Sequence, residues 1–134
     1  DYFKQYNDRY GHQAGDDCVR AIAALIRQME SDQIFCARYG GDEFVIIYSG
    51  MSAEEVCERA EKLRQDVMAL QIEQRYTEGA FGVTISQGIC HDIPSNGNKN
   101  WDFLHVADQA LYRVKRRGRN RLCMTDIHGR EIEV

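Results

Sequence analysis

Two adjacent carboxylates, Asp42 and Glu43, follow a pair of glycines and are the residues best suited to metal or phosphate chemistry in this chain. The apolar runs 34–37 and 44–48 on either side predict two strands, so the glycines fall where a hairpin must reverse. Glycine tolerates positive φ and lets a ligand approach the backbone closely. Neighbouring acids repel each other unless a cation or an acid/base role compensates. An ordinary solvated turn is the alternative.

Composition limits the classes of function. The 134 residues suffice for one domain, and a formal net charge of -4 argues against a general binder of nucleic acid or anionic membranes. Five scattered cysteines without a C-x-x-C pair indicate reduced thiols. No apolar run approaches the ~20 residues of a membrane span, and no signal peptide opens the chain, so we expect a cytoplasmic domain without direct membrane contact.

The apolar periodicity predicts a mixed α/β (α+β) fold. Helices are expected over 16–29, 52–70 and 104–114, and further strands over 83–90 and 122–124. Asp1 would end a truncated first strand. With that strand restored, the order gives a ferredoxin-like or palm-like β-α-β-β-α-β core around a central, mainly antiparallel sheet. The tail 125–134 is either a short hairpin or disordered.

Several motifs stand around the acidic turn in a fixed order. They are Asp1-Tyr2-Phe3-Lys4, Asn7-Asp8, Gly11-His12 and Gly15-Asp16 before it, and Asp108-Gln109-Ala110-Leu111-Tyr112, Lys115 and Gly118-Arg119-Asn120 after it. Together with Tyr39-Gly40-Gly41-Asp42-Glu43-Phe44, they resemble the GGDEF family of diguanylate cyclases over nearly the whole chain. The resemblance implies a single GGDEF domain at 1–134 that is truncated at its N-terminus.

The resemblance also implies a reaction. In that family two GTP molecules condense to cyclic di-GMP and two pyrophosphates, with Mg²⁺ or Mn²⁺, at a homodimer of GGDEF domains controlled by an upstream sensory or receiver domain. Asp42 matches the metal ligand of the turn. Glu43 matches its neighbour, which takes part in metal binding or accepts the hydroxyl proton. Lys4 matches the lysine that contacts phosphate.

Guanine recognition falls to two residues by the same resemblance. Guanine presents a ring N–H beside an exocyclic amine, a donor pair that one carboxylate can accept, and Asp16 stands where the family places that carboxylate. Asn7 matches the amide that reads the remaining edge of the base. Without the family, Asp16 would be a helix N-cap and Asn7 a turn former.

The remaining family matches concern phosphate. The amides around Phe3 lie near the polyphosphate in the family, and Lys115 with Arg119 matches a distal basic pair for the β- and γ-phosphates. Arg38 and Asp108 are interpreted as structural. The other basic residues of the same stretch are expected to face solvent, namely Arg113, Arg116, Arg117 and Arg121.

The chain departs from the family pattern at two places. Relatives open this region with D-x-D-x-F-K, in which the first Asp holds metal. Asp1 aligns with the second, so we expect weakened metal binding and little or no activity in the chain as given, even where its parent is an enzyme. Many relatives carry an R-x-x-D product-inhibition motif where this chain has Ser31-Asp32-Gln33-Ile34. An active cyclase without that feedback site is expected, with a GTP-binding or degenerate regulatory module as the alternative. A pure interaction domain explains none of these spacings.

Overall fold

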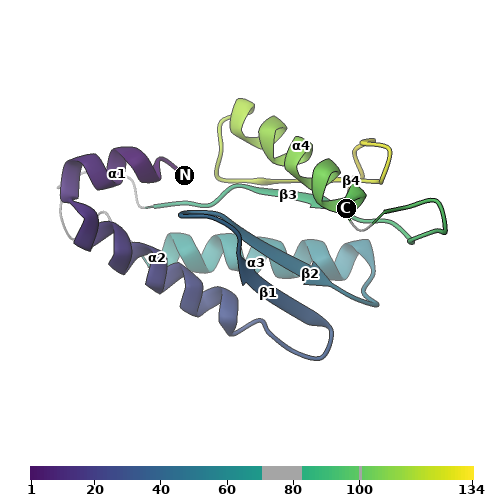
Figure 1. The fold of residues 1–134 in the computed structure, drawn as a ribbon, viewed down its shortest axis with the longest axis horizontal. Coiled ribbons are helices and arrows are strands. Elements are labelled where there is room, and N and C mark those ends of the chain that lie inside the picture. The colour runs from purple at the N-terminus through teal and green to yellow at the C-terminus, as the bar shows by residue number, and fades with distance from the viewer. Residues whose placement is uncertain (71–82, 100) are drawn as a thin grey trace. The chain divides into compact units, whose positions relative to one another are not determined.

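A computed structural model describes residues 1–70, 83–99 and 101–134 (Figure 1). It shows a mixed α/β fold whose described part contains four helices and four short strands. In chain order the elements are α1 (Phe3–Tyr10), α2 (His12–Arg27), β1 (Ile34–Arg38), β2 (Phe44–Tyr48), α3 (Ala53–Ala69), β3 (Gln87–Cys90), α4 (Asp102–Arg116) and β4 (Leu122–Thr125).

The chain forms two compact units. The first comprises Asp1–Ser52 and Gln65–Val83, and the second comprises Ala53–Arg64 and Thr84–Val134. The first contains an antiparallel pair, β1 with β2, and the second contains a parallel pair, β3 with β4. These two sheets are the ones found in the described residues, so a single palm-like sheet stays a prediction.

In the first unit, α1 and α2 meet at Gly11. Its N–H donates to the carbonyl of Asn7 (2.8 Å), and its own carbonyl accepts from the N–H of Gly15 (3.1 Å). Gly11 therefore ends one helix and begins the next, and its φ of +90° is a conformation that suits glycine. α2 then buries one face, consisting of Ala14, Gly15, Cys18, Val19, Ile22 and Ile26.

Helix α1 was not predicted, and α2 begins four residues before the expected start at Asp16. Residues 1 and 2 precede α1 without forming a strand. The signal for α1 is the aromatic spacing of Phe3, Tyr6 and Tyr10, of which Tyr6 is buried and packs 4.8 Å from the ring of Tyr10. Polar residues surround these rings, which weakens the apolar stripe on which the prediction relied.

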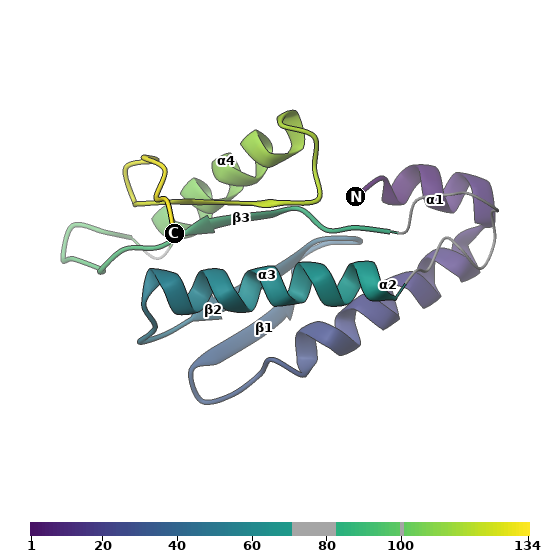
Figure 2. The ribbon, with the colours of Figure 1, turned by 180° about the vertical axis from the view of Figure 1, so that it is seen from behind.

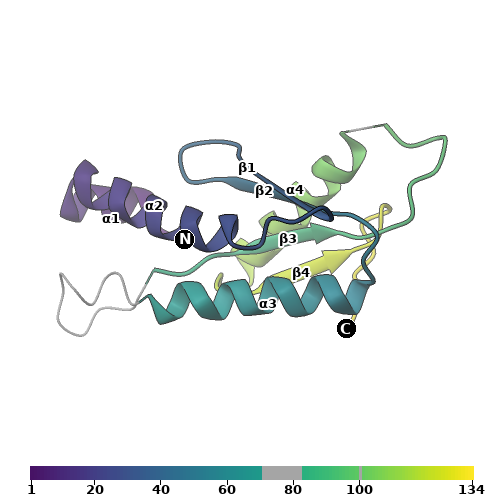
Figure 3. The same cartoon turned by 90° about the horizontal axis from the view of Figure 1, so that it is seen from below.

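The hairpin of the first unit agrees with the prediction. β1 and β2 pair from Ile34 with Tyr48 to Arg38 with Phe44, which leaves residues 39–43 as the turn. Figures 1 and 3 show this turn at the end of the hairpin opposite to the connection into α3.

The second unit is a β-α-β arrangement to which the first part of α3 adds buried Val56, Ala60 and Leu63. Figure 2 shows β3 and β4 side by side with α4 packed along them. Val114 of α4 is fully buried, with Ala110 and Cys123. The helices expected at 52–70 and 104–114 are confirmed, whereas the strand expected over 83–90 is confined to β3.

The tail after β4 forms a short hairpin rather than a disordered end. Thr125 bridges Glu131 in antiparallel fashion, and the N–H of Ile132 donates to the carbonyl of Met124 (2.8 Å). Asp92 supports it from the end of β3, because its Oδ2 accepts the N–H of Ile127 (3.0 Å). That hydrogen bond, with a second from the N–H of Ile93, lowers the pKa of Asp92.

The residues described include no helix that is both long and apolar enough to cross a membrane.

Packing of α4 on β3 depends on Gly88. A Cβ at this position would overlap the carbonyl oxygen of Ala107 and the amide nitrogen of Leu111, both of which are backbone atoms of α4. We predict that Gly88→Ala lowers the free energy of unfolding by about 1–3 kcal/mol, because the helix must move outward. Gly97→Ala is the control, since its Cβ meets nothing within 4 Å, and should change stability by less than about 0.5 kcal/mol. Urea unfolding measures both, and equal midpoints would contradict the close approach.

Candidate functional site

The acidic turn is closed by hydrogen bonds to its backbone. The N–H groups of Tyr39 and Gly40 both donate to the carbonyl of Glu43, at 2.8 and 3.2 Å. Arg38 donates from Nε to the carbonyl of Gly40 (3.0 Å) and from Nη2 to the carbonyl of Gly41 (2.5 Å). Two carbonyl oxygens that no strand satisfies are thus occupied by one guanidinium group.

The two carboxylates of the turn remain available. Asp42 and Glu43 are both exposed, and neither side chain accepts a hydrogen bond from another described residue. Carboxylate oxygens are the ligands that Mg²⁺ and Mn²⁺ prefer, and magnesium sites commonly use one or two carboxylates together with substrate phosphates. Across the described ranges no group of three or more His, Cys, Asp or Glu side chains could hold an ion. With its two adjacent exposed carboxylates, the turn fits a site of the two-carboxylate kind.

The packing of α1 on α2 brings Asn7 against Gly15, the residue before Asp16. The side-chain amide of Asn7 lies against Gly15, so closely that a Cβ on Gly15 would overlap it. Asp16 follows on the same helix and is exposed. The amide oxygen of Asn7 is buried without a hydrogen-bond partner in the described part of the chain, which is uncommon for a polar atom.

The two alternative interpretations of these residues are wrong. Asp16 is not a helix N-cap, because α2 begins at His12 and Gly11 occupies the capping position. Asn7 is not a turn former, because it lies inside α1.

Lys4 and Phe3 open α1. Lys4 is exposed and Phe3 is half-buried. The start of α1 therefore presents a cation to solvent, and a polyphosphate site requires such a cation.

Lys115 and Arg119 lie in the second unit, at the end of α4. The guanidinium of Arg119 donates from Nη1 to the carbonyl of Lys115 (3.4 Å), which makes the two residues neighbours. Lys115 is exposed and Arg119 is half-buried. Lys115 and Arg119 form a basic pair within the second unit.

Of the remaining arginines of this stretch, Arg116, Arg117 and Arg121 are exposed, as expected, whereas Arg113 is half-buried. Arg113 donates to the carbonyl of Gly129 (2.9 Å), and Arg117 pairs with Glu131. The hydrogen bond from Arg117 lowers the pKa of Glu131. Arg121 donates from Nε to the carbonyl of Arg119 (2.9 Å). Arg113 and Arg117 thus bind the short C-terminal hairpin, which local sequence does not reveal.

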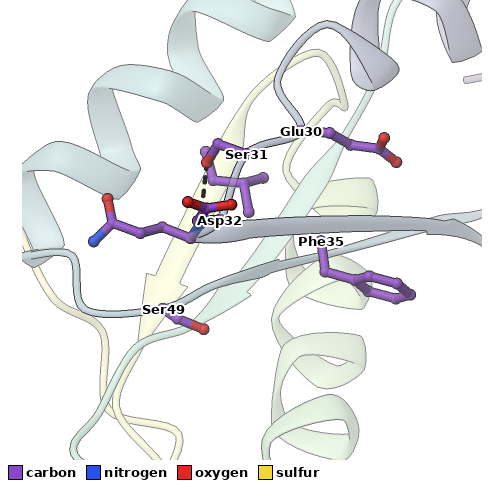
Figure 4. Close-up of a pocket in the computed structure, with 7 residues that line it drawn as sticks. Glu30, Ser31, Asp32, Phe35 and Ser49 are labelled. Carbon is purple, nitrogen blue, oxygen red and sulfur yellow. Dashed lines mark hydrogen bonds between the residues drawn. The ribbon is translucent and has the colours of Figure 1, made fainter.

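A pocket of about 390 Å³ lies where relatives carry the product-inhibition motif (Figure 4). Glu30 and Asp32 contribute carboxylates from the connection into β1, and Ser49 follows β2. None of the residues around it is basic; they are Glu30, Ser31, Asp32, Gln33, Ile34, Phe35 and Ser49. Carboxylates without a cation do not suit a ligand that carries phosphates.

Comparison with known proteins decides the family. The family described as "Diguanylate cyclase, GGDEF domain" matches residues 1–121. The chain is a GGDEF domain.

Several relatives of this GGDEF domain have been characterised or solved. It is 35% identical over 130 residues to a diguanylate cyclase of Vibrio cholerae serotype O1, covering 92% of this chain and 37% of that protein. It is similar to the GGDEF domain of DgcB from Caulobacter crescentus, solved in complex with c-di-GMP (36% identity, TM-score 0.81, covering 96% of this chain and 73% of that one). It is also similar to the active GGEEF domain of a diguanylate cyclase from Vibrio cholerae (34% identity, TM-score 0.77, covering 92% and 76%). The chain spans about a third of the length of the first curated relatives that it matches.

The tight contact between Asn7 and Gly15 can be tested by stability alone. We predict that Gly15→Ala is destabilising by about 1–2 kcal/mol, because the overlap with the amide outweighs the better helix propensity of alanine. In the double variant Gly15→Ala/Asn7→Ala the overlap is gone, so stability should return to at least the level of Asn7→Ala. Thermal unfolding of the three variants measures this, and additive losses would show that the two side chains do not meet.

Proposed function

We propose that this GGDEF domain is the catalytic domain of a diguanylate cyclase, which condenses two GTP molecules into cyclic di-GMP and two pyrophosphates. The observation that carries the proposal is the amide of Asn7, packed on Gly15 and beside Asp16 with its buried oxygen unpaired. A polar group held in this way by a glycine, next to an exposed carboxylate, suits a ligand that has both donors and acceptors.

Guanine has that combination of groups. Its ring N–H and exocyclic amine would both donate to the carboxylate of Asp16, which is exposed and one residue beyond Gly15. The amide of Asn7 would read the remaining edge of the base. Adenine lacks the paired donors on that edge, so the pair favours GTP over ATP.

The acidic turn would hold the metal. Asp42, with Glu43 beside it, would bind Mg²⁺ or Mn²⁺, and the ion would neutralise charge on the transferring phosphate when bound. Arg38 keeps the turn carbonyls occupied, so the exposed carboxylates are the oxygens that the turn offers. Glu43 would also accept the proton of the attacking 3'-hydroxyl.

Cations would orient the polyphosphate. Lys4 and the backbone amides around Phe3 serve this purpose in the first unit, and Lys115 with Arg119 would take the β- and γ-phosphates. Alignment and charge neutralisation are the main catalytic needs of such a displacement.

The chemistry also requires two chains. Each 3'-hydroxyl attacks the α-phosphate of the other nucleotide, so two sites that each hold one GTP must face each other. We therefore propose a homodimer as the active form, and a sensory or receiver domain in the longer protein as the element that controls its assembly. The relatives are about three times as long as this chain, which leaves room for such a domain.

Product analysis with GTP and Mg²⁺ tests the proposed turnover. We expect the protein at high concentration to convert GTP to cyclic di-GMP at a low rate, in keeping with the weakened metal binding expected from the sequence. Asp42→Asn should lower that rate by about a hundredfold or more through loss of a metal ligand. Asp32→Asn is the control, because Asp32 is an exposed acid at the other end of the β1–β2 hairpin. Asp32→Asn should turn over GTP at the rate of the unmodified protein. The melting temperatures of both variants should equal that of the unmodified protein. Binding of GTP without any product in the unmodified protein would favour a regulatory GTP-binding module instead.

Base recognition is tested separately from turnover. Asp16→Asn replaces a double acceptor by a group that accepts one donor and opposes the other, which should weaken GTP binding by about 1–3 kcal/mol. Affinity for inorganic tripolyphosphate should change little. Asp17→Asn, the neighbouring exposed acid, is the matched control and should leave both affinities unchanged. Equal weakening toward GTP and tripolyphosphate after Asp16→Asn would exclude a role in reading the base.

A further inference from the structure

The backbone of the loop after α4 is held in an uncommon conformation. Gly118, Arg119 and Asn120 have φ values of +111°, +64° and +49° in succession. Asparagine visits the left-handed region at modest cost, but arginine rarely does, so such a segment persists only where its surroundings fix it.

Arg64 of α3 supplies that fixation from a distant part of the sequence. Its Nη1 donates to the side-chain Oδ1 of Asn120 (3.1 Å) and lies 3.5 Å from the carbonyl oxygen of the same residue. The other edge of the guanidinium binds Glu61, with Nε to Oε2 at 3.0 Å and Nη2 to Oε1 at 2.5 Å. The side chain of Arg64 is 19% exposed. Glu61 orients the guanidinium group, and the guanidinium group holds Asn120.

The loop transmits this restraint to Arg119. The N–H of Arg119 donates to the carbonyl of Val114 (3.1 Å), and its own carbonyl accepts from Nε of Arg121 (2.9 Å). With the backbone anchored on both sides, the guanidinium of Arg119 folds back to the carbonyl of Lys115. The conformation of Asn120 thus bears on where the guanidinium of Arg119 lies relative to the backbone of Lys115.

We propose that Arg64 is a positioning residue, which fixes the left-handed backbone at Asn120 and thereby presents Arg119 beside Lys115 for the polyphosphate of the nucleotide. This inference rests on the proposed function, because it assigns Arg119 to phosphate. Arg64 itself does not touch the ligand. Its contribution passes through Arg119, which distinguishes it from an arginine that only stabilises α3.

A double-mutant cycle tests this distinction. The variants are Arg64→Gln, Arg119→Ala and the combination, and the probes are GTP and inorganic tripolyphosphate, measured by calorimetry. Arg59→Gln is the control, since it removes an exposed arginine from the same helix. We expect Arg64→Gln to weaken the binding of both ligands by about threefold to tenfold. The same substitution should have little further effect on binding once Arg119 is alanine. In turnover, the KM for GTP should rise while kcat changes little.

The outcomes separate the inference from the proposed function. If Arg119→Ala weakens binding but Arg64→Gln does not, the positioning role is wrong and the proposed function stands. The positioning role would also be overturned if Arg64→Gln lowered the affinity equally in the presence and in the absence of the Arg119 side chain, because the effect would then be structural. If the unmodified protein binds neither GTP nor tripolyphosphate, both the function and the inference fail.

A second variant keeps the test valid if Arg64→Gln destabilises the fold. Asn120→Gly removes the Oδ1 acceptor yet tolerates positive φ, and it leaves the pair of Arg64 with Glu61 intact. Should Arg64→Gln melt well below Arg59→Gln, this variant replaces it in the cycle. Asn120→Gly should weaken the binding of tripolyphosphate, and only while Arg119 is present. An unchanged affinity would overturn the proposal.

Discussion

Hydrogen bonds from arginine to backbone carbonyl oxygens hold three loops in the described part of this domain. Arg38 binds the turn between β1 and β2, Arg64 binds the loop after α4, and Arg113 binds the C-terminal hairpin. Each loop has carbonyl groups that no strand or helix satisfies, and a planar guanidinium with five donors can reach several atoms at once. The loops can therefore keep defined shapes although most of their side chains face solvent.

This arrangement leaves the chemically useful groups unused by the fold. In the first unit, the turn is closed by Arg38 and by its own amides, so Asp42 and Glu43 are not needed to hold it. In the second unit, Arg113 and Arg117 bind the C-terminal hairpin, whereas Lys115 is exposed. Adjacent carboxylates that satisfy no partner repel each other, and a divalent cation relieves that repulsion.

Much of the fold follows from periodicity in the sequence. The hairpin around 39–43 and the helices α3 and α4 carry regular apolar spacing, and their bounds agree with the prediction to within a few residues. Helix α1 was not predicted because its buried residue, Tyr6, has polar neighbours in the sequence. Its absence from the prediction also led to the mistaken view of Asp16 as a possible helix cap.

Candidate site residues that would act through their own chemistry could be named from the sequence. A residue that would act by positioning another could not. Asp42 and Asp16 could be named from type and position within a recognisable pattern. The bond between Arg64 and Asn120 joins residues 56 positions apart, and the sole local sign of it is the spacing of Glu61 and Arg64 on one helix face. Contacts of this kind depend on tertiary packing, which a single sequence does not reveal.

The central claim is that the turn binds a metal together with the nucleotide held by Asn7 and Asp16. Nuclear magnetic resonance with Mn²⁺ tests it most directly, because a paramagnetic ion broadens nearby amide signals. The protein would be titrated with Mn²⁺ in the presence of a GTP analogue that cannot react. The account predicts that the amides of Asp42 and Glu43 broaden first, followed by those at the start of α1, and that Asp42→Asn abolishes this order. Broadening centred on Glu30 and Asp32, with the turn unaffected, would contradict it.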